Sequence, residues 1–141
     1  MEKKTTENNE DIKEENSNKD DTFLSIVKVK INPELDLYLD SRRSIMHVEC
    51  VNADAKKIEE YISDSGEVLL GRPLHIALEL ILTSAIDSGY LKENAAVSIS
   101  LEEINIDYVS DYEKVLEDIR EEADEAIQSV ISDKYTILIV T

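Results

Sequence analysis

The sequence is poor in the residues that usually build chemical sites. It contains one cysteine, Cys50, so neither an intramolecular disulfide nor a thiolate metal cluster can form. The two histidines, His47 and His75, fall in different predicted elements, and neither has the spacing of metal ligands. Three scattered glycines cannot make a glycine-rich phosphate loop. We therefore expect no metal, no cofactor and no small-molecule substrate.

Basic residues and long apolar runs are also scarce. The chain has 15 lysines and arginines against 32 aspartates and glutamates, a formal net charge of −17. A surface with this charge repels phosphate backbones and anionic lipids, so nucleic acid and membrane surfaces are poor partners. No apolar run approaches the roughly 20 residues of a membrane span, and the N-terminus lacks the apolar core of a signal peptide. The sequence as written predicts a soluble chain that stays in the cytoplasm.

Residues 1–21 differ in composition from the rest of the chain. They hold eight acidic and four basic side chains, and Ile12 is their one large aliphatic residue. Such a segment cannot bury enough apolar surface to offset the entropy lost on ordering, so we predict that it is disordered. The remaining residues, 22–141, have the length and the apolar content of a single domain.

The apolar pattern of this domain predicts five strands. Alternation of apolar and polar side chains predicts the first four, and β-branched residues are frequent in them. The fifth is almost continuously apolar, which predicts a position at the centre of the sheet. These segments are TFLSIVKVKI, LDLYLD, IMHVECV, AAVSISL and YTILIV.

Helical spacing of apolar residues predicts three helices between these strands. The first covers about residues 53–63, with Asn52 as its N-cap. The second begins near Pro73 and ends at Gly89. A capping box of Ser110 and Glu113 precedes the third. The order β-β-β-α-α-β-α-β then predicts an α+β fold, with the helices packed on one face of a mixed sheet of about five strands.

Most side chains that could support catalysis have a simpler structural interpretation. His75 lies on the flank of a predicted helix, where a surface or boundary position is ordinary. His47 beside Glu49 could form an acid-base pair, but a polar pair between neighbouring strands is the favoured interpretation. Cys50 shares a strand face with apolar residues, which predicts a buried and unreactive thiol. The six carboxylates within residues 117–125 lack an EF-hand pattern and are interpreted as a solvent-exposed helix face.

The dipeptide Asn32-Pro33, between the first two predicted strands, has unusual chemistry. Proline has no N–H, so the next backbone nitrogen cannot attack the asparagine side chain, which is the usual route of asparagine damage. The side-chain nitrogen of Asn32 can instead attack its own main-chain carbonyl, which forms a succinimide and expels Pro33 as a new N-terminus. A fold accelerates this reaction if it holds the attacking geometry and strains the bond. The alternative is structural, because Asn-Pro commonly begins a turn or ends a strand.

This region also resembles a known family. The run SIVKVKINPELDLYLDSRRSIMHVECVNADAKKI is similar to the start of the middle, extracytoplasmic domain of RsgI-type anti-sigma factors. In that family an alternating strand runs into an Asn-Pro, and a second strand, a turn, a third strand and an Asn-Asp-Ala-Lys-like helix start follow. The similarity extends from about residue 22 to the end, through GRPLHIALELILTSAIDSGYL, AAVSISL and EKVLEDIREEADEAIQSVISDKYTILIV.

The resemblance implies a domain that cleaves itself once at the Asn-Pro bond, with the two pieces held together by the sheet. By position, Asn32 would supply the attacking amide and the scissile carbonyl, and Pro33 would be the leaving nitrogen. The strand from Leu35 to Leu39 would hold the broken end. In such factors an extracellular pull separates the pieces and starts the intramembrane proteolysis that frees a sigma factor. The implied partner is therefore a protein, which the sequence does not identify.

Two features depart from the family pattern. Members usually carry a cytoplasmic sigma-binding segment and a transmembrane helix before this domain, where this sequence has the acidic residues 1–21. Members often have a small hydroxyl residue after the proline, where this sequence has Glu34. Two hypotheses follow: a self-cleaving RsgI-like signalling domain, and a non-catalytic protein-interaction module of the same fold.

Overall fold

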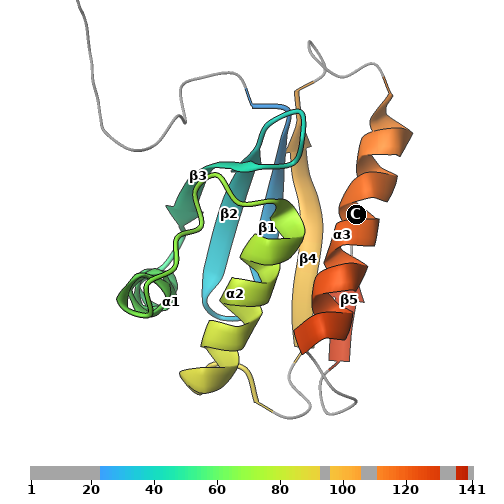
Figure 1. Ribbon diagram of the computed structural model, residues 1–141. Helices are drawn as coiled ribbons and strands as arrows, with labels where there is room; N and C mark the ends of the chain where they lie inside the picture. Colours follow the sequence, from blue (N-terminus) through green and yellow to red (C-terminus); the bar gives the residue numbers. More distant parts are fainter. Residues whose placement is uncertain (1–22, 93–95, 106–110, 131–135, 140–141) are drawn as a thin grey trace, which may run out of the picture.

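A mixed β-sheet with three helices on one of its faces makes up the fold (Figure 1). The computed structural model describes residues 23–92, 96–105, 111–130 and 136–139, so the predicted disordered tail of residues 1–21 lies outside the described residues. The elements follow the order β-β-β-α-α-β-α-β. The predicted α+β fold with five strands and three helices is therefore confirmed.

The sheet has the strand order β3-β2-β1-β4-β5. Four strands are antiparallel to their neighbours, and β5 runs parallel to β4. β1 is the central strand, so it exchanges hydrogen bonds with β2 on one side and β4 on the other. The bounds of the elements are β1 (Ser25–Lys30), β2 (Glu34–Leu39), β3 (Ile45–Cys50), α1 (Ala53–Asp64), α2 (Leu74–Asp87), β4 (Ala96–Ile104), α3 (Tyr112–Val130) and β5 (Thr136–Ile139).

The prediction of a central position for the last strand was wrong, because β5 lies at the edge of the sheet. Among the described residues it pairs with β4 alone, from Ala96↔Thr136 to Ile99↔Ile139. A continuous apolar run indicates that both faces of a strand are covered, but it carries no information on how many strands flank it. The central strand, β1, has an alternating sequence because one face of this largely antiparallel sheet is polar.

The core lies between the other face of the sheet and the helices. The alternating leucines of β2 and the valines of β1 point into it, as the period-2 pattern predicted. Helix α2 supplies the widest apolar stripe, since its steps of three and one residues keep these side chains on one face. The largest side chains that are fully buried include Leu35, Leu37, Leu39, Val27, Leu78, Ile81, Leu82 and Ile58.

The ends of the helices follow local sequence signals. The side chain of Asn52 accepts a hydrogen bond from the N–H of Ala55 and caps α1, as predicted. Gly89, with φ of +83°, follows the end of α2 in the expected left-handed conformation. The capping box predicted for α3 includes Ser110, which lies outside the described residues. At the described start of this helix, Asp111 accepts from the N–H of Lys114 at 3.1 Å.

Candidate self-cleavage site

Asn32 and Pro33 lie in the short turn that joins β1 to β2. Lys30 pairs with Glu34, so residues 31–33 span the end of the hairpin. The N–H of Ile31 donates to the carbonyl oxygen of Pro33 at 2.8 Å and closes the turn. The Asn32–Pro33 peptide bond is trans. The candidate bond is thus held between two strands that are paired right up to it.

The backbone of Asn32 is in a conformation that few residues other than glycine adopt. Its φ is +80°, in the left-handed region, where asparagine is tolerated because its short polar side chain can make local hydrogen bonds. Asn32 is exposed, whereas Pro33 is buried. The residue that carries the candidate attacking amide is therefore strained and accessible, and the candidate leaving residue is fixed by packing.

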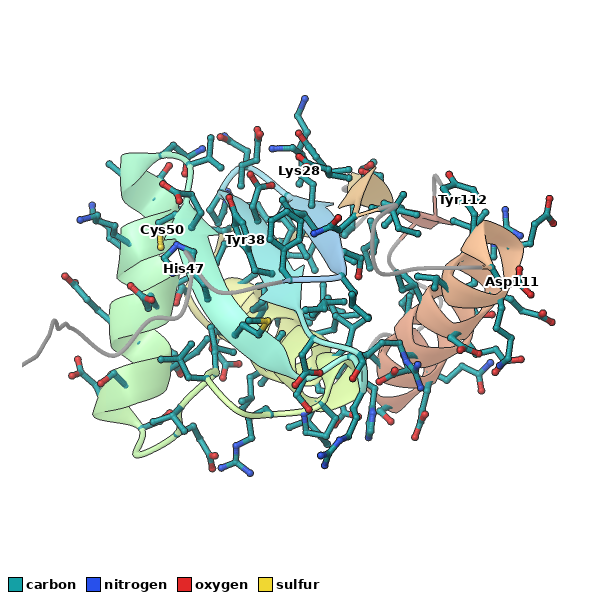
Figure 2. The ribbon with its side chains drawn as sticks, turned by 90° about the horizontal axis from the view of Figure 1, so that it is seen from above. Lys28, Tyr38, His47, Cys50, Asp111 and Tyr112 are labelled. Carbon is teal, nitrogen blue, oxygen red and sulfur yellow. The ribbon has the colours of Figure 1, made fainter. Side chains whose placement is uncertain are left out.

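Glu34, the residue after the proline, is held by a lysine of the neighbouring strand. Nζ of Lys28 lies 2.8 Å from Oε2 of Glu34, 3.0 Å from Oδ1 of Asp36 and 3.6 Å from Oε1 of Glu102. Figure 2 shows Lys28 on the side of the sheet that faces away from α2. This lysine bridges β1 to both of its neighbours, β2 and β4.

The hydrogen bond between these two side chains shifts both pKa values. It holds the pKa of Glu34 below its usual value and raises the pKa of Lys28. Glu34 is therefore ionised near neutral pH and only accepts hydrogen bonds.

β1 is anchored on both sides and would stay in place if the chain were broken after Asn32. It pairs with β2 from Ser25↔Leu39 to the turn, and with β4 along its whole length. Val27 and Val29 are 0% exposed in the core. Burial of each such side chain contributes roughly 1.5–3 kcal/mol, and the two hydrogen-bond ladders add to this.

Comparison with known proteins shows the family of this chain. A family model described as the anti-sigma factor RsgI-like central domain matches residues 24–141. The chain belongs to this family. It is also 23% identical over 128 residues to the anti-sigma-I factor RsgI9 of Acetivibrio thermocellus. That match covers 89% of this chain and 17% of the relative, so the chain spans less than a fifth of the relative's length.

The resemblance predicted from the sequence is thereby confirmed, and the family match begins at residue 24. Within the described residues, no cluster of three or more histidine, cysteine, aspartate or glutamate side chains could hold a metal ion. The same residues contain no helix that is both long enough and apolar enough to cross a membrane.

His47 of the RsgI-like domain contacts a carboxylate on its own strand. Its Nε2 lies 3.3 Å from Oε1 of Glu49, two residues further along β3. Residues i and i+2 of a strand share a face, which explains this contact. The cross-strand neighbour of His47 is Tyr38, whose ring meets the imidazole edge to face at a centroid distance of 5.1 Å. A cross-strand polar pair of His47 stays a prediction, and Figure 2 shows His47 and Tyr38 on neighbouring strands.

Cys50 is half-buried against the core at the end of β3. Its Sγ lies 3.6 Å from Oε1 of Glu59 on α1. Burial raises the pKa of the Cys50 thiol to about 11, and the neighbouring carboxylate of Glu59 adds to the shift. A thiol with this pKa is protonated near neutral pH and is a poor nucleophile, as the sequence predicted, although its burial is partial.

The carboxylates of α3 do not all form a solvent-exposed face. The side chains of Asp118 and Glu122 are 19% and 14% exposed, and both bind the guanidinium of Arg43 in the β2–β3 turn. Glu122 also accepts from the backbone N–H of His75 at 3.1 Å. Because Pro73 offers α2 no side-chain cap, Glu122 caps α2 from another helix. Sequence reasoning missed this contact because its partners are 47 residues apart.

Proposed function

We propose that this RsgI-like domain acts in signal transduction through protein contacts and cleaves itself once, between Asn32 and Pro33. The observation that carries the proposal is the left-handed backbone of Asn32 at the tip of a hairpin whose strands are paired on both sides. Strain in that position raises the energy of the intact chain, and breaking the bond relieves it.

The bonds that form and break in this reaction all lie within the turn. Nδ2 of Asn32 attacks the main-chain carbonyl carbon of the same residue, and a bond between them forms as the bond to the nitrogen of Pro33 breaks. The proton lost by Nδ2 passes to the nitrogen of Pro33, which becomes a new amino terminus. The N-terminal piece then ends in a succinimide, and hydrolysis of this ring adds one water molecule. Because the attacking and attacked atoms belong to one residue, the gain comes from holding them in a reactive geometry.

Cleavage at this turn would produce two pieces that share one sheet. The N-terminal piece would contribute β1, the central strand, and the rest of the sheet would belong to the other piece. Removing β1 requires both of its ladders to break and its buried valines to be exposed. We therefore propose that the pieces separate only under force, which would make the domain a mechanical element of anti-sigma factor signalling.

Mass spectrometry of the full chain under denaturing conditions tests the cleavage. After days at neutral pH we expect two species, residues 1–32 and 33–141, whose masses add up to that of the intact chain or exceed it by one water. Asn32→Ala should abolish both species. Asn52→Ala is the matched control, because it removes another asparagine that lies before a helix and not in the turn. The proposal is refuted if the wild-type sample contains intact chain and neither fragment after this time.

The ionised state of Glu34 favours the second candidate function, a non-catalytic interaction module. A carboxylate that is bound to Lys28 and has a lowered pKa is a weak base, so it relays the proton from Nδ2 to the nitrogen of Pro33 poorly. Replacing Glu34 by serine tests whether the ionised carboxylate prevents cleavage. If the wild-type chain stays intact and Glu34→Ser cleaves, the domain has kept the fold and lost the reaction.

A further inference from the structure

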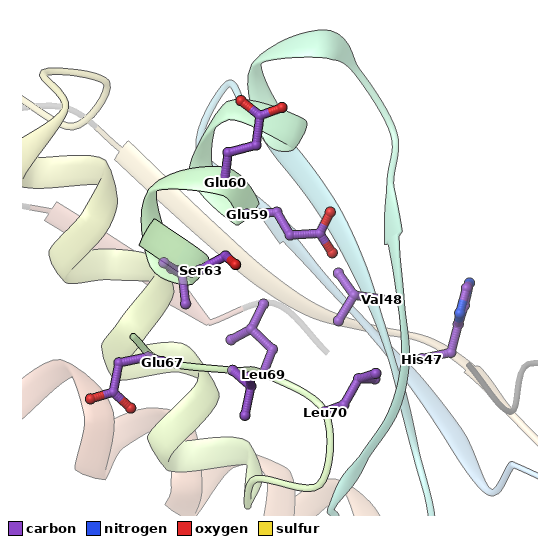
Figure 3. A pocket seen from close by; sticks show the side chains of 10 residues that line it. His47, Val48, Glu59, Glu60, Ser63, Glu67, Leu69 and Leu70 are labelled. Atoms are coloured by element: carbon purple, nitrogen blue, oxygen red, sulfur yellow. The ribbon is translucent and has the colours of Figure 1, made fainter. Parts of the chain in front are cut away.

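A groove lies between β3 and the second half of α1, away from the Asn32 turn (Figure 3). It has a volume of about 440 Å³. Its floor is apolar, since the buried side chains of Ile62 and Leu69 line it together with Val48 of β3. The loop after α1 adds Val68 and Leu70, which are 58% and 36% exposed. An apolar side chain that entered this groove would cover surface that is now in contact with water.

The side of the groove formed by β3 is the last strand of the sheet as the structure describes it. Among the described residues, β3 pairs with β2, and the loop after α1 binds its first residue, Ile45. The N–H of Val51, just after β3, donates to β2 at 3.0 Å. Because the hydrogen-bonding groups of an antiparallel strand alternate in direction, those of Val48 and Cys50 point away from β2. In the described part of the chain, no strand pairs with this stretch of β3.

The rim of the groove is acidic. Glu59 and Glu60 are exposed on α1, whereas Glu67, in the loop that follows, is paired with Arg72 at 3.2 Å (Figure 3). Lysine or arginine side chains of a partner would meet the carboxylates of Glu59 and Glu60. A second copy of the chain, with its net charge of −17, is repelled by the same rim.

We propose that this groove binds an extended, basic segment of a partner protein, which adds to the sheet as a strand beside β3. Main-chain hydrogen bonds to Val48 and Cys50 would hold the segment, and one apolar side chain would enter the groove. Residues two positions before and after that side chain point to the same face, about 7 Å away along the strand. At those positions lysine or arginine would reach Glu59 and Glu60. The partner motif therefore has an apolar residue at its centre and a basic residue two positions before it and two positions after it.

A synthetic peptide with this pattern tests the proposal on the full chain. The probe is fluorescein-labelled Thr-Lys-Thr-Leu-Thr-Lys-Thr-amide, and the matched probe carries glutamate in place of both lysines. Fluorescence anisotropy should show the lysine peptide binding at least about tenfold more tightly than the glutamate peptide, with an affinity that falls as salt is added. Equal binding of the two peptides, or no binding of the lysine peptide, overturns the proposal.

Charge reversal on the protein tests the rim. Glu59→Lys combined with Glu60→Lys should weaken binding of the lysine peptide by about tenfold. The matched control is Glu121→Lys combined with Asp124→Lys, two exposed positions on α3, which should leave the affinity unchanged. An equal loss in both double variants would show that only the overall charge matters, and it would contradict a specific groove.

Amide chemical shifts of the wild-type chain locate the bound peptide without any substitution. The amides of Val48 and Cys50 should shift when the lysine peptide is added, because their N–H groups gain acceptors. Shifts confined to other elements overturn the proposal. Sedimentation provides a last check, since a stable dimer that hides these two amides would show that the occupant is a second copy of the chain.

Discussion

Replacing Lys28 by methionine should weaken the fold more than any other removal of one surface charge beside the candidate turn. Lys28 is only 20% exposed and is the cation shared by three carboxylates. Methionine keeps most of the length of the side chain and removes the charge. The carboxylates of Glu34 and Asp36 on β2 and of Glu102 on β4 would then lie on either side of β1 without a cation between them.

The size of the stability loss in Lys28→Met follows from the contacts of the lysine. A hydrogen bond to a charged partner contributes about 1.5–3 kcal/mol, and the partial exposure of Lys28 and Glu34 places this one near the lower value. The contact with Asp36 at 3.0 Å adds a similar but smaller amount, whereas Glu102, which is 43% exposed, adds little. We expect Lys28→Met to lower the free energy of unfolding by about 2–3 kcal/mol at neutral pH.

The loss of stability caused by Lys28→Met should be smaller at acidic pH. The pKa of Glu34 is lower in the folded state than in the unfolded chain, so the pair stabilises the fold above the ordinary pKa of 4.5 and loses this effect as the pH falls through the folded value. In Lys28→Met the three carboxylates repel one another, and protonation relieves this repulsion. The difference between wild type and variant is therefore smaller near about pH 3.5 than at neutral pH.

Urea unfolding followed by circular dichroism measures the stability loss at neutral pH and at acidic pH. Lys30→Met is the matched control, because Lys30 is an exposed lysine on the same strand, and its loss should change the unfolding free energy by less than about 0.5 kcal/mol. The reasoning is refuted if the two variants lose the same stability at neutral pH. It is equally refuted if the loss in Lys28→Met grows as the pH is lowered.

Three further predictions concern other contacts. Glu122→Gln should cost about 1–2 kcal/mol in urea unfolding, because it weakens the cap on the N–H of His75. Asn52→Ala should cost about 1 kcal/mol through loss of the α1 cap, whereas Asn52→Ser should restore most of it. Cys50 should react slowly with a disulfide reagent at mildly alkaline pH, and its rate should rise up to about pH 11. Glu59→Gln should lower the pKa of that thiol and speed the reaction.

Much of the fold was predictable because it depends on residues that are close in sequence. Alternation placed Leu35, Leu37 and Leu39 on one face of a strand, and all three lie in the core. The cap of α1 at Asn52 and the end of α2 at Gly89 followed from local backbone preferences. The possible reaction at Asn32 could also be inferred, since it needs only an amide side chain and a following residue without an N–H.

What only the tertiary structure decided depends on contacts between distant segments. No local pattern in YTILIV could place that strand at the edge of the sheet, because the order of strands is set by which segments pair. The carboxylate of Glu122 caps α2 only because α3 packs beside it. The side chains of Asn32 and Pro33 determined which bond could break, whereas the pairing of β1 with β2 gave Asn32 its left-handed backbone and buried Pro33. Composition alone cannot specify strain, since strain arises when the rest of the fold holds a residue in a conformation that it would otherwise leave.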